Sequence, residues 1–155
     1  MFPRVASVVV TRPSHLDLRL VGLVAVGGAV GTTARWALTE WLGTAAGGWP
    51  TATFVANVLG SFLLGALLEG LLRRGPESRR GQQLRLGVGT GVLGGFTTFS
   101  SLALEMERLL AGEQVATGLV YGVASVLLGL VACLLGVALA ARRHAARLPQ
   151  DPDAA

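Results

Sequence analysis

The stretch GGFTTFSS, residues 94–101, places glycines, threonines and serines inside an otherwise apolar run of membrane-spanning length. Unsatisfied backbone or hydroxyl groups are costly in hydrocarbon, so a helix that only spans the bilayer gains nothing from them. Gly94 and Gly95 favour a helix break, which exposes carbonyls suited to a cation and amides or hydroxyls suited to an anion. The stretch therefore predicts an ion site. The alternative is a simple kink resealed by hydrogen bonds from Thr97 and Thr98.

Asn57 and Arg35 are polar side chains within other apolar segments. Asn57 lies in FVANVLGSF, where it either links helices through a hydrogen bond of about 1 kcal/mol or offers its amide to an ion. Arg35 lies in GTTARW, about two turns from the end of its segment. An unpaired guanidinium there is costly and usually functional. The alternative is that its long side chain extends to the membrane surface.

Tyr121, Ser125 and Glu105 complete the set of polar candidates. Tyr121 and Ser125 are four residues apart, which places them on one helix face. They either contribute hydroxyls to a site or bond within their own helix, as interior serines commonly do with the carbonyl four residues earlier. Glu105 follows Phe99 by six residues and would place a charge near the far end of the break.

Four segments are long enough to cross roughly 30 Å of hydrocarbon, which takes about 20 residues. The chain of 155 residues is 52% hydrophobic and 14% charged, with a mean hydropathy of +0.60, which indicates an integral membrane protein. Short linkers make successive helices antiparallel neighbours, so we expect one all-α, four-transmembrane-helix domain with a broken third helix. The domain covers 20–141, with crossings at 20–42, 51–72, 84–110 and 115–141 and tails at 1–19 and 142–155.

The basic residues are all arginines and fall unevenly on the two sides of the expected bundle. One side holds only Arg108, while Arg35 lies within a crossing. The positive-inside rule then predicts cytoplasmic termini in a multi-pass protein of the cell inner (plasma) membrane. These positions also argue against nucleic-acid binding as the reason for a pI near 11.0. The cytoplasmic side would hold Arg4, Arg12, Arg19, Arg73, Arg74, Arg79, Arg80, Arg85, Arg142, Arg143 and Arg147.

Glycines recur four residues apart on three segments, a spacing that lets helix backbones approach closely. The alternative is tight packing within one chain, but four thin helices enclose little volume. Stripes on several helices therefore predict a dimer. The stripes are Gly27 with Gly31, Gly87 with Gly91 and Gly95, and Gly118 with Gly122.

The sequence offers no catalytic constellation. Cys133 has no second cysteine with which to form a disulfide or a thiolate metal site. His144 has no histidine nearby, and neither a Ser-His-Asp set nor a phosphate-binding loop is present. We therefore expect no enzyme and no catalytic residues.

Four pieces of the chain resemble, in their order and spacing, the CrcB or Fluc fluoride channels, a family of small four-helix bacterial membrane proteins. The resemblance covers nearly all of residues 20–141. It implies a fluoride-selective channel that exports fluoride from the cytoplasm by passive permeation through pores at the interface of an antiparallel dimer. The pieces are GGAVGTTAR (27–35), FVANVLGSFLLG (54–65), GVLGGFTTFSS (91–101) and YGVAS (121–125).

The resemblance also implies two kinds of ion site. A structural sodium ion would lie at the dimer centre, facing the backbone carbonyls of Gly94 and Thr97. Fluoride is small and strongly hydrated, so its pore must replace water with several neutral donors that do not bind the ion too tightly. The residues implied are Asn57 (amide), Phe99 (ring edge), Ser100 and Ser101 (polar track), Tyr121 and Ser125 (pore lining), Glu105 (end of the track) and Arg35 (vestibule).

Two positions depart from the family pattern. The second pore phenylalanine is Leu102 here, and a serine of the fourth helix is Gly129. An aliphatic side chain has no positive ring edge, so one pore constriction would be weakened. An antiparallel homodimer also needs chains that insert both ways, which calls for balanced charge and not eleven arginines against one. We therefore favour dimerisation with an oppositely oriented homologue over dimerisation with an identical chain.

Two other functions are compatible with the same residues. The first is a non-conducting or one-pore partner subunit of a heterodimeric fluoride channel, which the changes at Leu102 and Gly129 favour. The second is a small proton-coupled exporter. Its chemistry needs a carboxylate near mid-span, whereas Glu69 and Glu105 lie nearer the ends of their helices.

Overall fold

The computed structural model describes residues 17–42 and 48–146. Every regular element in these two ranges is a helix, which confirms the all-α prediction. The tails expected at 1–19 and 142–155 lie largely outside the described residues. The elements are α1 (Leu18–Leu42), α2 (Thr51–Leu72), α3 (Arg79–Leu84), the π-helix η2 (Arg85–Leu93), α4 (Gly94–Phe96), α5 (Phe99–Ala111) and α6 (Val115–Ala145).

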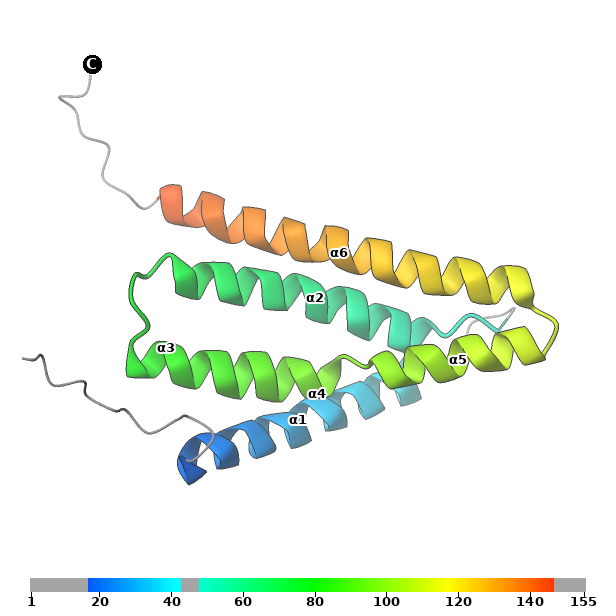
Figure 1. Ribbon diagram of the computed structural model, residues 1–155, viewed down its shortest axis with the longest axis horizontal. Helices are drawn as coiled ribbons and strands as arrows, with labels where there is room; N and C mark the ends of the chain where they lie inside the picture. The colour runs from blue at the N-terminus through cyan, green and yellow to red at the C-terminus, as the bar shows by residue number, and fades with distance from the viewer. Residues whose placement is uncertain (1–16, 43–47, 147–155) are drawn as a thin grey trace, which may run out of the picture.

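Three of the described helices, α1, α2 and α6, are long and apolar enough to cross a membrane. The remaining expected crossing is divided: α3, η2 and α4 follow one another directly, and α5 begins after an interruption. Figure 1 shows these pieces as one interrupted rod beside α2. α2 begins directly after Pro50, whose fixed φ suits a helix start, and the chain turns away at Gly75, where φ is 87°.

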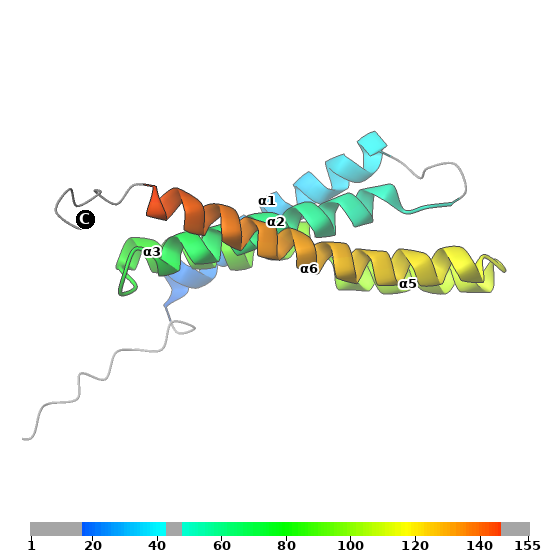
Figure 2. The ribbon, with the colours of Figure 1, turned by 90° about the horizontal axis from the view of Figure 1, so that it is seen from above.

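The helices pack in two main pairs, α2 against α6 and α1 against η2. Figure 2 shows α1 crossing the other helices obliquely. The start of α1, the loop between α2 and α3, and the end of α6 lie at the same end of the molecule (Figure 1). We call it the basic end, because these segments carry Arg19, Arg73, Arg74, Arg79, Arg80, Arg85, Arg142 and Arg143.

The glycine stripes are used within the chain. A Cβ on Gly27 would collide with the Gly87 carbonyl oxygen, and one on Gly31 with the Val92 carbonyl oxygen. A Cβ on Gly122 would likewise collide with the Met106 side chain. Close approach of α1 to η2, and of α6 to α5, therefore accounts for these stripes, so the spacing by itself gives no reason for a second subunit. The dimer stays a prediction that needs other support.

Gly31→Ala tests this packing. Its new Cβ would lie 2.8 Å from the Phe96 nitrogen and closer still to the Val92 carbonyl oxygen. Forcing α1 away from η2 should cost about 1–3 kcal/mol of stability, seen as a lower melting temperature of the protein in detergent. Gly22→Ala is the matched control, because a Cβ there meets no atom within 4 Å. Equal melting temperatures for both variants would contradict the packing argument.

Candidate functional site

The interruption between α4 and α5 consists of Thr97 and Thr98, which are both extended (φ/ψ −80°/155° and −153°/121°). We call these two residues the break. The prediction that Gly94 and Gly95 break the helix is wrong, because both remain helical in α4. The reason is tertiary: a Cβ on Gly95 would lie 3.0 Å from the Gly28 Cα, so this glycine is needed for contact with α1.

The break is held open by two hydrogen bonds from one side chain, which we call the Asn57–Thr98 clamp. The Asn57 Nδ2 donates to the Thr98 carbonyl at 2.9 Å, and the Thr98 N–H donates to Asn57 Oδ1 at 2.8 Å. Both backbone groups of Thr98 are thereby satisfied without a helix. The amide nitrogen of Asn57 carries a second hydrogen that neither bond uses.

Threonine hydroxyl groups form hydrogen bonds at the two helix ends beside the break. Thr97 Oγ1 donates to the Leu93 carbonyl at 2.9 Å, and Thr98 Oγ1 accepts from the Ser101 N–H at 3.2 Å as the cap of α5. Thr98 Oγ1 also bonds the hydroxyls of Ser100 and Ser101, each at 3.2 Å. Thr97 thus makes the back-bond expected of a resealed kink, but Thr98 does not, and the helix stays interrupted.

These contacts leave two carbonyls without their usual helical donors. The Gly94 carbonyl would receive the Thr98 N–H four residues on, but that N–H is held by Asn57. The Thr97 carbonyl would receive the Ser101 N–H, but that N–H is held by Thr98 Oγ1. Gly94 and Thr97 both line one hollow of about 430 Å³, together with Asn57 and Phe99. The site residues Gly94, Thr97, Asn57 and Phe99 are therefore brought together.

A second polar cluster surrounds Glu105 on α5. Its carboxylate accepts from the Thr53 hydroxyl at 2.7 Å and from the Tyr121 hydroxyl at 2.6 Å. Tyr121 is fully buried, and its ring lies edge-on to Trp49 with centroids 5.3 Å apart. Ser125 donates to the Tyr121 carbonyl at 2.7 Å, which is the within-helix bond weighed as the alternative for this residue.

Thr53 is the site residue that the sequence reasoning missed. It precedes Asn57 by four residues on α2, just as Ser101 precedes Glu105 by four on α5. Residues at this spacing share a helix face, and that signal was available in the sequence. The two polar clusters are therefore neighbours, one about 6 Å further along the helix axes than the other.

Arg35 and Phe99 take contrasting positions. The Arg35 Nε donates to the Gly95 carbonyl at 3.4 Å, and the Thr32 hydroxyl reaches the same oxygen at the same distance. Arg35 is thus held against α4, beside the break. Phe99 is 78% exposed, so its ring projects away from the rest of the chain. Leu102, by contrast, is buried against Tyr121 and Leu109.

The fold and the site together define a multi-pass membrane protein with an interrupted helix and an interior line of polar side chains. The family described as "CrcB-like protein, Camphor Resistance (CrcB)" matches residues 22–137. The chain belongs to this family.

Individual relatives support this assignment. The chain is 46% identical to "Fluoride-specific ion channel FluC 2" of Leifsonia xyli subsp. xyli, over 83% of this chain and 88% of the relative. It is 44% identical to "Fluoride-specific ion channel FluC" of Thermus thermophilus, over 76% and 90%. It is 40% identical to "Fluoride-specific ion channel FluC 1" of Cutibacterium acnes, over 85% and 92%. These relatives are named as ion channels, so the family is not one of enzymes.

Asn57→Leu tests the Asn57–Thr98 clamp. The substitution leaves the N–H and carbonyl of Thr98 without partners, at a cost of about 1–3 kcal/mol for each group that stays buried. Amide hydrogen exchange of a peptide covering 97–101 should become faster, because the Thr98 N–H loses its acceptor. Thr39→Val is the control, since it removes one exposed hydroxyl bond to the Arg35 carbonyl. Unchanged protection at Thr98 in Asn57→Leu would refute the clamp.

Proposed function

We propose that this chain is a subunit of a fluoride-selective channel that lets fluoride leave the cytoplasm passively. The observation that carries the proposal is the match to relatives named as fluoride-specific ion channels, combined with a break whose side chains are neutral donors. Asn57 has a free amide hydrogen, and Ser100 and Ser101 place their hydroxyls against Thr98 Oγ1 in the same break.

The pore would run past the two polar clusters. Fluoride would meet the Asn57 amide, the Phe99 ring edge and the serine hydroxyls, and then approach the group formed by Glu105 and Tyr121. Neutral donors can replace hydration water without the deep well that a full positive charge would create. Tyr121 and Ser125 both use their hydroxyls within the chain. Their contribution to the pore would therefore be to fix Glu105 and the path around it.

A structural sodium ion would be bound by the two carbonyls that the break deprives of helical donors. Gly94 and Thr97 line the same hollow, and uncharged carbonyl oxygens are suitable ligands for a hard cation. Two carbonyls are too few for a complete coordination shell, so the same pair from a second subunit would supply the rest. This need supports a dimer with the break at its centre, arranged antiparallel so that the two breaks face each other. The role of the ion would be structural.

We favour a partner that is a homologous chain inserted the other way. Eight of the described arginines gather at the basic end, and Arg108 alone lies on the opposite side, so this chain would insert with both termini in the cytoplasm. Position 102 is a leucine, so this chain would offer one pore phenylalanine, Phe99. Relatives named with the numbers 1 and 2 are consistent with two-copy arrangements.

A one-pore or non-conducting partner subunit is the second candidate, favoured by the changes at Leu102 and Gly129. The proton-coupled exporter has no support in the names of the relatives. The plasma membrane would be the site of action in every case.

Fluoride efflux from liposomes tests the channel. Phe99→Ile and Asn57→Asp should each reduce fluoride flux by about an order of magnitude or more, because one removes the ring edge and the other replaces a donor with a negative charge. Leu104→Ile is the control, as an exposed apolar change on the same helix. Flux should need a co-reconstituted homologue. Robust flux from this chain alone would contradict the preference for a partner, and wild-type flux in both site variants would remove the pore assignment.

Single-cysteine labelling tests the orientation. Ala146→Cys should react with an impermeant maleimide only from the cytoplasmic side, and Glu113→Cys only from the outside, because these residues follow opposite ends of the bundle. Both would be made with Cys133 replaced by Ala. Labelling of either position from both sides would show dual insertion and would support a homodimer.

A further inference from the structure

The loop between α2 and α3 encloses a hollow that the proposed pore does not use. Its volume is about 560 Å³, and it lies at the basic end. Leu68, Leu71 and Leu72, from the last turns of α2, form its apolar side. Arg74 and Arg80 stand on its polar side. We call it the arginine-rimmed hollow.

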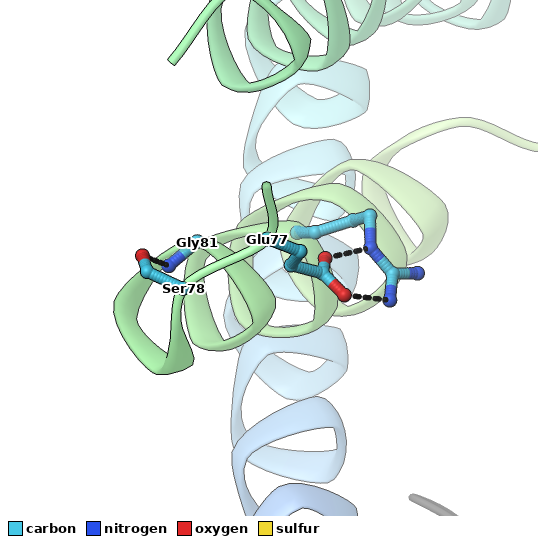
Figure 3. A network of polar contacts seen from close by, with 4 residues as sticks. Glu77, Ser78 and Gly81 are labelled. Atoms are coloured by element: carbon cyan, nitrogen blue, oxygen red, sulfur yellow. Dashed lines mark hydrogen bonds and ion pairs between the residues drawn. The ribbon is translucent and has the colours of Figure 1, made fainter. Parts of the chain in front are cut away.

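The acidic residue of this hollow is already paired. The Arg85 Nε donates to Glu77 Oε1 at 2.7 Å, and a terminal guanidinium nitrogen donates to Oε2 at 3.3 Å, as the dashed lines of Figure 3 show. The bond from Arg85 holds the pKa of the Glu77 carboxyl below its usual value. Glu77 and Arg85 therefore cancel as a charged pair, and neither neutralises the two rim arginines.

The rim arginines carry uncompensated positive charge. Arg73 is held by Glu69 at 2.5 Å, but Arg74, Arg79 and Arg80 make no side-chain hydrogen bond or ion pair within the described residues. The start of α3 offers nothing further, because Ser78 Oγ already accepts the Gly81 N–H at 3.1 Å (Figure 3). An occupant of the hollow would thus be recognised by guanidinium groups, which bind phosphate through paired N–H donors.

The apolar side of the hollow selects the kind of phosphate. Leu72 is 74% exposed and Leu68 is 42% exposed at the end of a membrane-spanning helix, where acyl chains meet headgroups. A free phosphate ion gains nothing from leucines. A phospholipid would cover them with its chains while its phosphate met Arg74 and Arg80, as anionic headgroups do in basic pockets between membrane helices.

We propose that the arginine-rimmed hollow is a binding site for one anionic phospholipid on the cytoplasmic leaflet. The site is independent of fluoride permeation, because it lies outside the break and shares none of its residues. It would also fix the membrane depth of the loop between α2 and α3.

Native mass spectrometry of the purified full chain in mild detergent tests the site, with phosphatidylglycerol or phosphatidylcholine of identical acyl chains added. Wild-type protein should retain phosphatidylglycerol in preference to phosphatidylcholine by roughly tenfold. The double variant Arg74→Gln/Arg80→Gln should lose that preference. Arg142→Gln/Arg143→Gln is the matched control, because it removes the same charge from the same end without touching the hollow, and it should keep the preference.

Glu77→Gln should change phosphatidylglycerol retention in the opposite direction. It frees Arg85 and removes the negative charge beside the rim, so phosphatidylglycerol retention should rise severalfold. Misfolding does not produce such a gain. The proposal is overturned if Arg74→Gln/Arg80→Gln retains phosphatidylglycerol like wild type, or if wild type shows no preference between the two lipids. Displacement of the lipid by equimolar inorganic phosphate would overturn the lipid identity and leave a phosphate site.

Discussion

The two hydrogen bonds between Asn57 and Thr98 are the interaction on which the rest of the site depends. A helix break in hydrocarbon is stable only if its backbone groups find partners, and a single primary amide provides both a donor and an acceptor. With Thr98 held extended, its hydroxyl is placed to cap α5 and to gather the hydroxyls of Ser100 and Ser101. The clamp thus satisfies backbone groups that would otherwise be unpaired, and it orders the polar groups around them.

The clamp also couples two helices through their registers. Asn57 and Thr53 lie on one face of α2, and they contact the break and Glu105 on the neighbouring rod. A rotation or slide of α2 that loosened one contact would loosen the other, because residues four apart on a helix move together. Tyr121 adds α6 to this arrangement by donating to the same carboxylate as Thr53. The helices that frame the site are therefore positioned by polar contacts as well as by glycine packing.

The sequence predicted the helical elements well, because apolar length and flanking residues determine them locally. The expected bounds of α2 agree with the structure, and Pro50 at its start is a local signal. The break was misplaced by three residues, because the glycine tendency to end helices was outweighed by the contact of Gly95 with Gly28, which no local rule reveals. The helix α6 continues to Ala145, one turn beyond the crossing expected at 115–141.

Site residues could be predicted where a strongly polar side chain lies in an apolar segment, and less well where the residue type is common. Asn57 and Glu105 are conspicuous in apolar segments, whereas Thr53 is a common residue that gains meaning only from its distance to Glu105. Phe99 is largely exposed, and it lies beside a hollow that Gly94 and Thr97 also line. Lipid tails can cover a phenyl ring but cannot satisfy a carbonyl oxygen. A surface with both needs would be better matched by protein and a cation than by the bilayer, and this is the physical argument that supports the proposed dimer.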